Sequence, residues 1–76
     1  MDALKPLDRR VIEELGNLHN DYVEAAKDIF EANEAGKPLM PPIIKMEVVL
    51  EQIYLQSPVS YDAVRRHYQN NVLCRL

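Results

Sequence analysis

Cysteine and long apolar runs are the two features that this sequence most clearly lacks. Cys74 is the single cysteine, so no disulfide can form within the chain. The opening residues, Met-Asp-Ala-Leu-Lys-Pro, are too polar for a secretory leader. We therefore expect a reducing, intracellular setting, either cytoplasmic or nuclear. No stretch approaches the roughly 20 apolar residues that cross a bilayer, so we expect no membrane partner.

Glycine is also scarce, and the sequence carries no motif that is typical of phosphate or metal binding. Two glycines cannot build the glycine-rich loop that cradles a phosphate. The paired cysteine and histidine spacings of zinc sites are missing as well. His67 and Cys74 are seven residues apart, which places their Cα atoms about 10 Å apart on a helix, too far for a nucleophile–base pair. His19 is remote from both in the sequence.

Acidic residues are frequent, but their spacing does not indicate general acid–base chemistry. The pairs Glu13–Glu14 and Glu31–Glu34 lie on the polar face of a predicted helix. A catalytic carboxyl group needs a pocket that raises its pKa, and a solvated face does not supply one. We therefore predict no catalytic residue, no metal, no cofactor and no small-molecule substrate, so the chain is not expected to be an enzyme.

The length of 76 residues predicts one domain, over residues 1–76, with a small core. A chain of this size buries only about 60% of its unfolded surface, so a partner chain is an expected source of extra stability. The net charge of −3 is uneven: residues 1–35 sum to −5 and residues 36–76 to +2. This balance argues against non-specific nucleic-acid binding by the whole chain, but it allows a small basic site in the second half.

Apolar spacing predicts three helices, at about residues 7–34, 42–56 and 60–73. The first is long and acidic, with Gly16 tolerated in its interior at a cost of about 1 kcal/mol relative to alanine. A kink or a close helix crossing at Gly16 are the alternatives. Gly36 is expected just beyond the C-terminus of this helix, and Ser60 is the expected N-cap of the third. The predicted fold is therefore all-α, a bundle-like arrangement of three helices joined by proline-rich turns.

The apolar positions of each predicted helix recur every three or four residues, which is the spacing of a core-facing stripe. The predicted core positions are Leu7, Val11, Leu15, Leu18, Tyr22, Ala25 and Ile29 in the first helix, Ile43, Met46, Val49, Leu50 and Ile53 in the second, and Tyr61, Val64, Tyr68 and Val72 in the third.

The second predicted helix has an additional apolar stripe, formed by Ile44, Val48 and Leu55. A helix with two apolar stripes is either enclosed by its own fold or presents one stripe to another molecule. The proline-rich connector is expected to tuck Leu39 and Met40 against the core, and it could also fold back over the second stripe. We favour an exposed stripe that binds a protein partner or a second copy of the chain. The predicted contact residues are Ile44, Val48, Leu55, Tyr54, Leu39 and Met40.

A helix-turn-helix is the alternative interpretation of the second half of the chain. Arg65, Arg66, Gln69 and Asn70 would be exposed on its second helix, and these residue types read bases or contact phosphates. The turn lacks the usual glycine, however, and Asp62 would lie near the phosphates. The sequence therefore favours a protein-interaction module, either an adaptor, a small complex subunit or a modulator, over a nucleic-acid-binding regulator.

Overall fold

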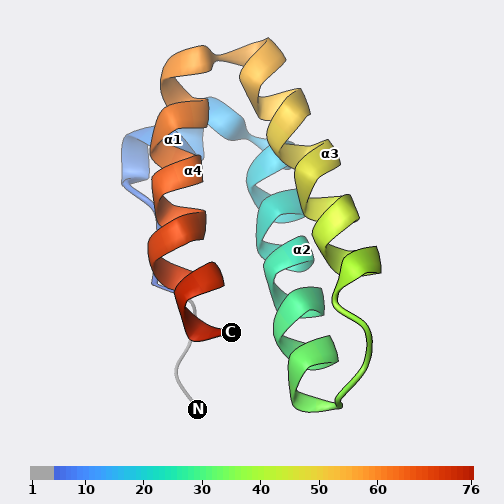
Figure 1. Ribbon diagram of the computed structural model, residues 1–76. Helices are drawn as coiled ribbons and strands as arrows, with labels where there is room; N and C mark the ends of the chain where they lie inside the picture. The colour runs from blue at the N-terminus through green and yellow to red at the C-terminus, as the bar shows by residue number, and fades with distance from the viewer. Residues whose placement is uncertain (1–4) are drawn as a thin grey trace.

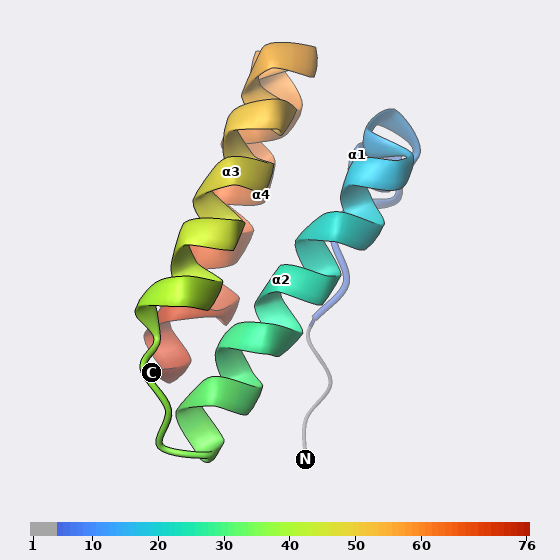
Figure 2. The same cartoon turned by 90° about the vertical axis from the view of Figure 1, so that its right-hand side faces the viewer.

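Helices form nearly all of the chain that the computed structural model describes, which is residues 5–76. Their bounds are Arg9–Leu15 for α1, Asn17–Glu34 for α2, Met40–Gln56 for α3, Pro58–Asn71 for α4 and Leu73–Arg75 for the short 3-10 helix η1. The three longer helices lie side by side, and α1 lies at one end of this group (Figures 1 and 2). The all-α prediction is confirmed, but the described chain has four α-helices and not three.

The fourth helix exists because the chain breaks at Gly16, where a continuous helix over residues 7–34 was predicted. Gly16 has φ 58° and ψ −122°, a combination that lies outside every helical region. Its N–H donates to the carbonyl of Ile12 and ends α1, while its own carbonyl accepts from His19 as α2 begins. Glycine adopts positive φ without the steric penalty of a Cβ, so this position separates α1 from α2. The separated α1 contacts both α4 and α2.

The C-terminus of α2 follows the prediction. Gly36 has φ 69°, and the N–H of Lys37 donates to the carbonyl of Ala32 over 2.9 Å. This bond closes the last helical turn in the manner of a Schellman motif, in which a left-handed residue follows the helix. The chain then crosses to α3 through Lys37, Pro38 and Leu39 (Figure 1).

The N-termini of α3 and α4 both begin two residues earlier than predicted. Pro41 and Pro42 lie inside the first turn of α3, where a missing N–H removes no hydrogen bond. Ser57, and not Ser60, caps α4: its Oγ accepts from the N–H of Ser60 at 3.3 Å. Ser60 was misassigned because a serine three residues into a helix and a serine at its cap look alike in the sequence.

The core lies between α2, α3 and α4 and is closed at one end by α1 and the segment before it. The fully buried side chains of largest volume are Tyr22, Ile29, Met46, Leu50, Ile53, Val64 and Val72. All seven were predicted to face the core from their spacing of three and four residues. Val11, Leu18, Ile43 and Tyr61 are only partly buried and pack against the edge of this cluster.

Candidate functional site

Helix α3 has apolar side chains on two opposite sides. One side faces the core through Met46, Val49, Leu50 and Ile53. The other side, called the outer face here, is formed by Met40, Ile44, Val48 and Leu55, of which Leu55 is 76% exposed and Val48 is 49% exposed. The outer face runs for about 23 Å, given a rise of 1.5 Å per residue.

The connector between α2 and α3 does not cover the outer face. Leu39 is half-buried, as predicted, but Met40 is 65% exposed and the prediction that it tucks against the core is wrong. The physical reason is the early start of α3: Met40 belongs to the first helical turn, four residues before Ile44, so it shares the exposed side of the helix. Exposed apolar side chains that gather on one side of a helix are typical of interaction surfaces.

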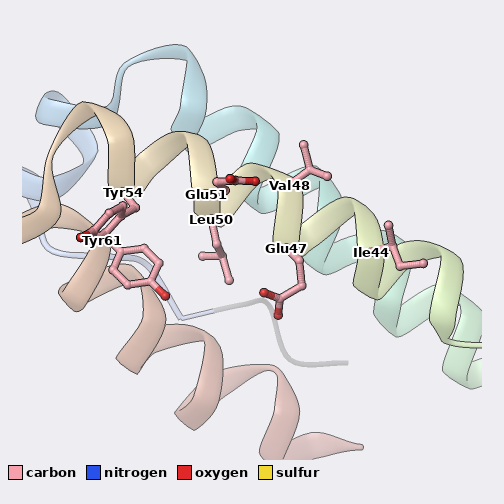
Figure 3. A pocket seen from close by; sticks show the side chains of 7 residues that line it. All are labelled: Ile44, Glu47, Val48, Leu50, Glu51, Tyr54 and Tyr61. Carbon is pink, nitrogen blue, oxygen red and sulfur yellow. The ribbon is translucent and has the colours of Figure 1, made fainter.

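A groove of about 490 Å³, the α3–α4 groove, lies beside the outer face. Figure 3 shows its lining, with the two tyrosine rings at one end and Ile44 at the other. The lining residues are Ile44, Glu47, Val48, Leu50, Glu51, Tyr54 and Tyr61. Apolar and aromatic groups predominate in this lining, which is typical of surfaces that bind proteins.

The tyrosine end of the α3–α4 groove is held in place by contacts between side chains. Tyr54 and Tyr61 meet edge to face, with ring centroids 5.1 Å apart and an interplanar angle of 80°. The guanidinium of Arg65 donates to the Tyr61 hydroxyl over 2.9 Å and lies 5.9 Å from the centre of its ring. Such contacts restrict the rotamers of the two aromatic side chains.

The charged residues of the groove lining are both acidic. Glu47 and Glu51 are exposed, and neither forms a salt bridge with any residue in the described part of the chain. They are four residues apart on one helix, where two like charges destabilise the helix by about 0.2–0.5 kcal/mol. Glu47 also acts beyond the groove, because its charge adds to the effect of burial in raising the pKa of Tyr68. This pair therefore has no evident role in stabilising the fold.

The opposite edge of α3 carries Lys45, whose charge is already balanced by α2. Its Nζ lies 2.8 Å from a carboxylate oxygen of Asp28 and 3.4 Å from one of Glu24. The hydrogen bond to Asp28 is the main cause of the raised pKa of Lys45, and the charges of Asp28 and Glu24 add to it. Two carboxylates share this one ammonium group, and Lys37 lines the same pocket as Asp28 and Lys45, so the charges along the α2 edge are balanced.

The basic residues of α4 lie at the surface as predicted, but the arrangement of α3 and α4 is a helical hairpin. Arg66 pairs with Asp62 at 3.4 Å, and Gln69 and Asn70 are exposed. In both views α4 returns alongside α3, antiparallel to it (Figures 1 and 2). A helix-turn-helix instead crosses its two helices at a steep angle, which lets the second helix enter a groove of DNA.

A second polar feature lies inside the bundle, where the Tyr22 hydroxyl meets His67 Nδ1 at 2.6 Å. The other ring nitrogen, Nε2, bonds the carbonyl oxygen of Lys5. A carbonyl can only accept, so Nε2 carries a proton, and in the neutral imidazole Nδ1 therefore accepts from the tyrosine. The contact joins α2, α4 and the segment before α1, and it borders a cavity of about 210 Å³. Because Tyr22 is fully buried, its pKa is raised.

Alkaline pH tests the assignment of Tyr22 as a neutral, buried donor. Its pKa in the folded chain lies above the ordinary value of about 10, so unfolded chains ionise first as the pH rises. The stability that Tyr22 contributes is thus complete below about pH 10 and decreases above it, by at most about 1.4 kcal/mol per pH unit. We expect the Tyr22→Phe variant to lose less stability than the native chain between pH 9 and about 11 in urea unfolding.

The control for this experiment is Tyr54→Phe, which removes an exposed hydroxyl and should retain the pH dependence of the native chain. At neutral pH, Tyr22→Phe leaves Nδ1 of His67 without its donor and should cost about 1–3 kcal/mol. Equal alkaline slopes for Tyr22→Phe and the native chain would show that the Tyr22 hydroxyl is solvated.

Other residues that were considered for chemistry do not come together. Cys74 is exposed, and its Sγ lies 2.8 Å from the carbonyl oxygen of Asn70. In residues 5–76 no group of three histidine, cysteine or acidic side chains is placed to hold a metal ion. None of the helices in this range is both long enough and apolar enough to cross a membrane.

The structure brings together most of the residues predicted to bind a partner and adds others. Ile44, Val48 and Tyr54 line one groove, whereas Leu55 and Met40 lie along the outer face and Leu39 lies in the connector. Glu47 and Glu51 were not among the residues predicted to contact a partner. A signal for Glu51 was present, since it is seven residues after Ile44 and four before Leu55.

Comparison of the chain with known protein families, with curated proteins and with solved structures gives no match.

Proposed function

We propose that this chain is a non-enzymatic protein-interaction module that binds its partner through the outer face of α3 and the adjoining α3–α4 groove. The observation that carries the proposal is the exposure of Met40, Ile44, Val48 and Leu55 along one side of α3. Burying such side chains on binding would contribute about 25 cal/mol per Å² of apolar surface, before the costs of association.

The composition of the site supports a protein partner over a small molecule or a nucleic acid. The α3–α4 groove is open and lined mainly by apolar groups, and its charged lining residues, Glu47 and Glu51, would repel phosphates. Tyr54 and Tyr61 are of a type that often contributes most to binding energy at protein interfaces. The alternative of nucleic-acid binding would have to use Arg65 and Arg66, which already contact Tyr61 and Asp62.

The test of the proposal is a charge placed on the outer face. We expect Val48→Glu to abolish partner binding while the chain remains folded, because Val48 is half exposed and its loss creates no cavity in the core. The matched control is Asn17→Glu, which adds the same charge to an exposed position of α2 away from the outer face. Circular dichroism checks that both variants are helical and unfold within a few degrees of the native chain.

Binding is measured by placing a photo-crosslinking amino acid at position 55, on the outer face, and at position 20, on the solvated side of α2. A discrete crosslinked partner at position 55 that disappears with Val48→Glu and persists with Asn17→Glu supports the proposal. Light scattering over a dilution series detects a second copy of the chain as the partner. If the chain stays monomeric on dilution and Val48→Glu leaves every crosslink unchanged, the proposal is wrong.

Salt-sensitive DNA or RNA binding that is lost with Arg65→Ala would favour the alternative of a nucleic-acid-binding protein.

A further inference from the structure

We infer that the partner is a basic amphipathic helix of another protein, whose apolar side chains pack on the outer face of α3 and whose lysine or arginine residues pair with Glu51 and Glu47. The inference rests on the proposed function and specifies the partner by its chemistry. A single helix fits because the outer face is straight and narrow, and its apolar residues are spaced by one or two helical turns.

The position of Glu51 is the first argument. It lies on the same side of α3 as Ile44 and Leu55, so a helix packed along the outer face covers it. Figure 3 shows its carboxylate among the groove-lining side chains together with that of Glu47. A carboxylate that is covered without a cation loses its hydration and gains no compensating interaction, which strongly disfavours binding. The partner must therefore supply a cation at this place.

A second copy of this chain is a poorer occupant of the outer face, which is the second argument. A two-fold dimer of outer faces would bring Glu47 and Glu51 of both copies into one interface. Lys45, the lysine of α3, already pairs with Asp28 and Glu24 of α2. A dimer would thus add carboxylates to a surface that already carries them, whereas a basic helix from another protein would neutralise them.

The surrounding charge is the third argument. Glu47 and Glu51 repel each other on adjacent turns of α3 and have no salt bridge among residues 5–76. Glu24 and Asp28 on the α2 edge are balanced by Lys45 and by Lys37, which lines the same pocket, so the uncompensated charge beside the outer face is that of Glu47 and Glu51. A cationic partner would relieve the repulsion between Glu47 and Glu51. Arg65 is held on Tyr61 at the far end of the groove.

The experiment is a selection from a displayed library of single helices with a fixed apolar stripe and randomised flanking positions. The library is selected on the native chain, on Glu51→Lys, and on Glu34→Lys, which makes the same change in net charge at the far end of α2. We expect lysine and arginine to be enriched at the flanking positions on the native chain and on Glu34→Lys, and acidic residues to be enriched on Glu51→Lys. A selected basic peptide should bind Glu51→Lys at least about tenfold more weakly than the native chain.

The outcomes separate this inference from the proposed function. If the selected helices lose binding with Val48→Glu but show no basic preference and bind Glu51→Lys equally well, the outer face is a docking site and the charge inference is wrong. If the native chain forms a dimer that Val48→Glu dissociates, a second copy is the occupant and the inference is likewise wrong. If no helix is enriched, or enriched helices bind Val48→Glu unchanged, both the inference and the proposed function fail.

Discussion

Replacing Ile53 with alanine is expected to lower the free energy of unfolding by about 2–5 kcal/mol, because it leaves a cavity in a close-packed core. Ile53 is 0% exposed and lies on the core-facing side of α3 among other large apolar side chains. A chain of this length has a total stability of only about 4–11 kcal/mol at typical values per residue. The variant should therefore be partly unfolded at physiological temperature, which urea or thermal unfolding followed by circular dichroism will measure.

Leu55→Ala is the matched control, two residues further along the same helix and on its opposite side. Leu55 is 76% exposed, so its truncation leaves no cavity and should change stability by less than about 0.5 kcal/mol. Binding should show the reverse order, because Leu55 belongs to the outer face and Ile53 does not. A large loss of stability in Leu55→Ala would mean that the outer face is covered by the chain itself in solution.

The side of each helix that faces the core could be predicted from the sequence because it depends on local spacing. Residues three and four apart share a helical face whatever the rest of the chain does. The predicted core positions Tyr22, Ile29, Met46, Ile53 and Val64 are all buried for this reason. The apolar residues of the outer face of α3 were predicted in the same way. Whether Ile44 and Val48 are exposed could not be predicted, because their exposure depends on the path of the connector.

Contacts between distant parts of the chain could not be predicted. The pairing of Tyr22 with His67 joins residues 45 positions apart, and His67 had been considered only as a possible partner of Cys74. The meeting of Tyr54 and Tyr61 depends on the hairpin of α3 and α4, which spacing within either helix does not define. The candidate site could therefore be predicted only as an apolar stripe on one helix. The adjoining α3–α4 groove could not be predicted, because it forms only where two helices pack together.

The break at Gly16 could not be predicted for a different reason. A glycine within a helical pattern of apolar residues is compatible with two structures. A continuous helix tolerates glycine at a cost of about 1 kcal/mol, and a break uses its freedom to adopt positive φ. The periodicity of three and four continues across the break, from Leu15 to Tyr22, since both α1 and α2 pack on the same core. The spacing alone therefore predicts one helix where the chain forms two.

Replacing Gly16 with L-alanine is expected to destabilise the chain by about 1–3 kcal/mol, through the backbone and not through crowding. A Cβ at this position would have no atom within 4 Å, so the cost comes from φ 58° and ψ −122°, which L-residues rarely adopt. D-alanine, introduced by chemical synthesis, favours positive φ and restricts the unfolded chain, so it should be neutral or stabilise by up to about 1 kcal/mol. Urea unfolding of the three chains measures both differences.

The two alanine variants are expected to change the stability in opposite directions only if the bend at Gly16 is rigidly held. If the bend at Gly16 were held weakly, L-alanine would instead join α1 and α2 into one long helix, with higher helicity by circular dichroism and little loss of stability. That outcome would also move α1 away from α4, which nuclear Overhauser contacts between Leu15 and α4 would report. Because Leu15 is buried and α1 contacts α4 in the bent form, we expect the contacts with α4 to hold the bend, so L-alanine strains the chain without straightening it.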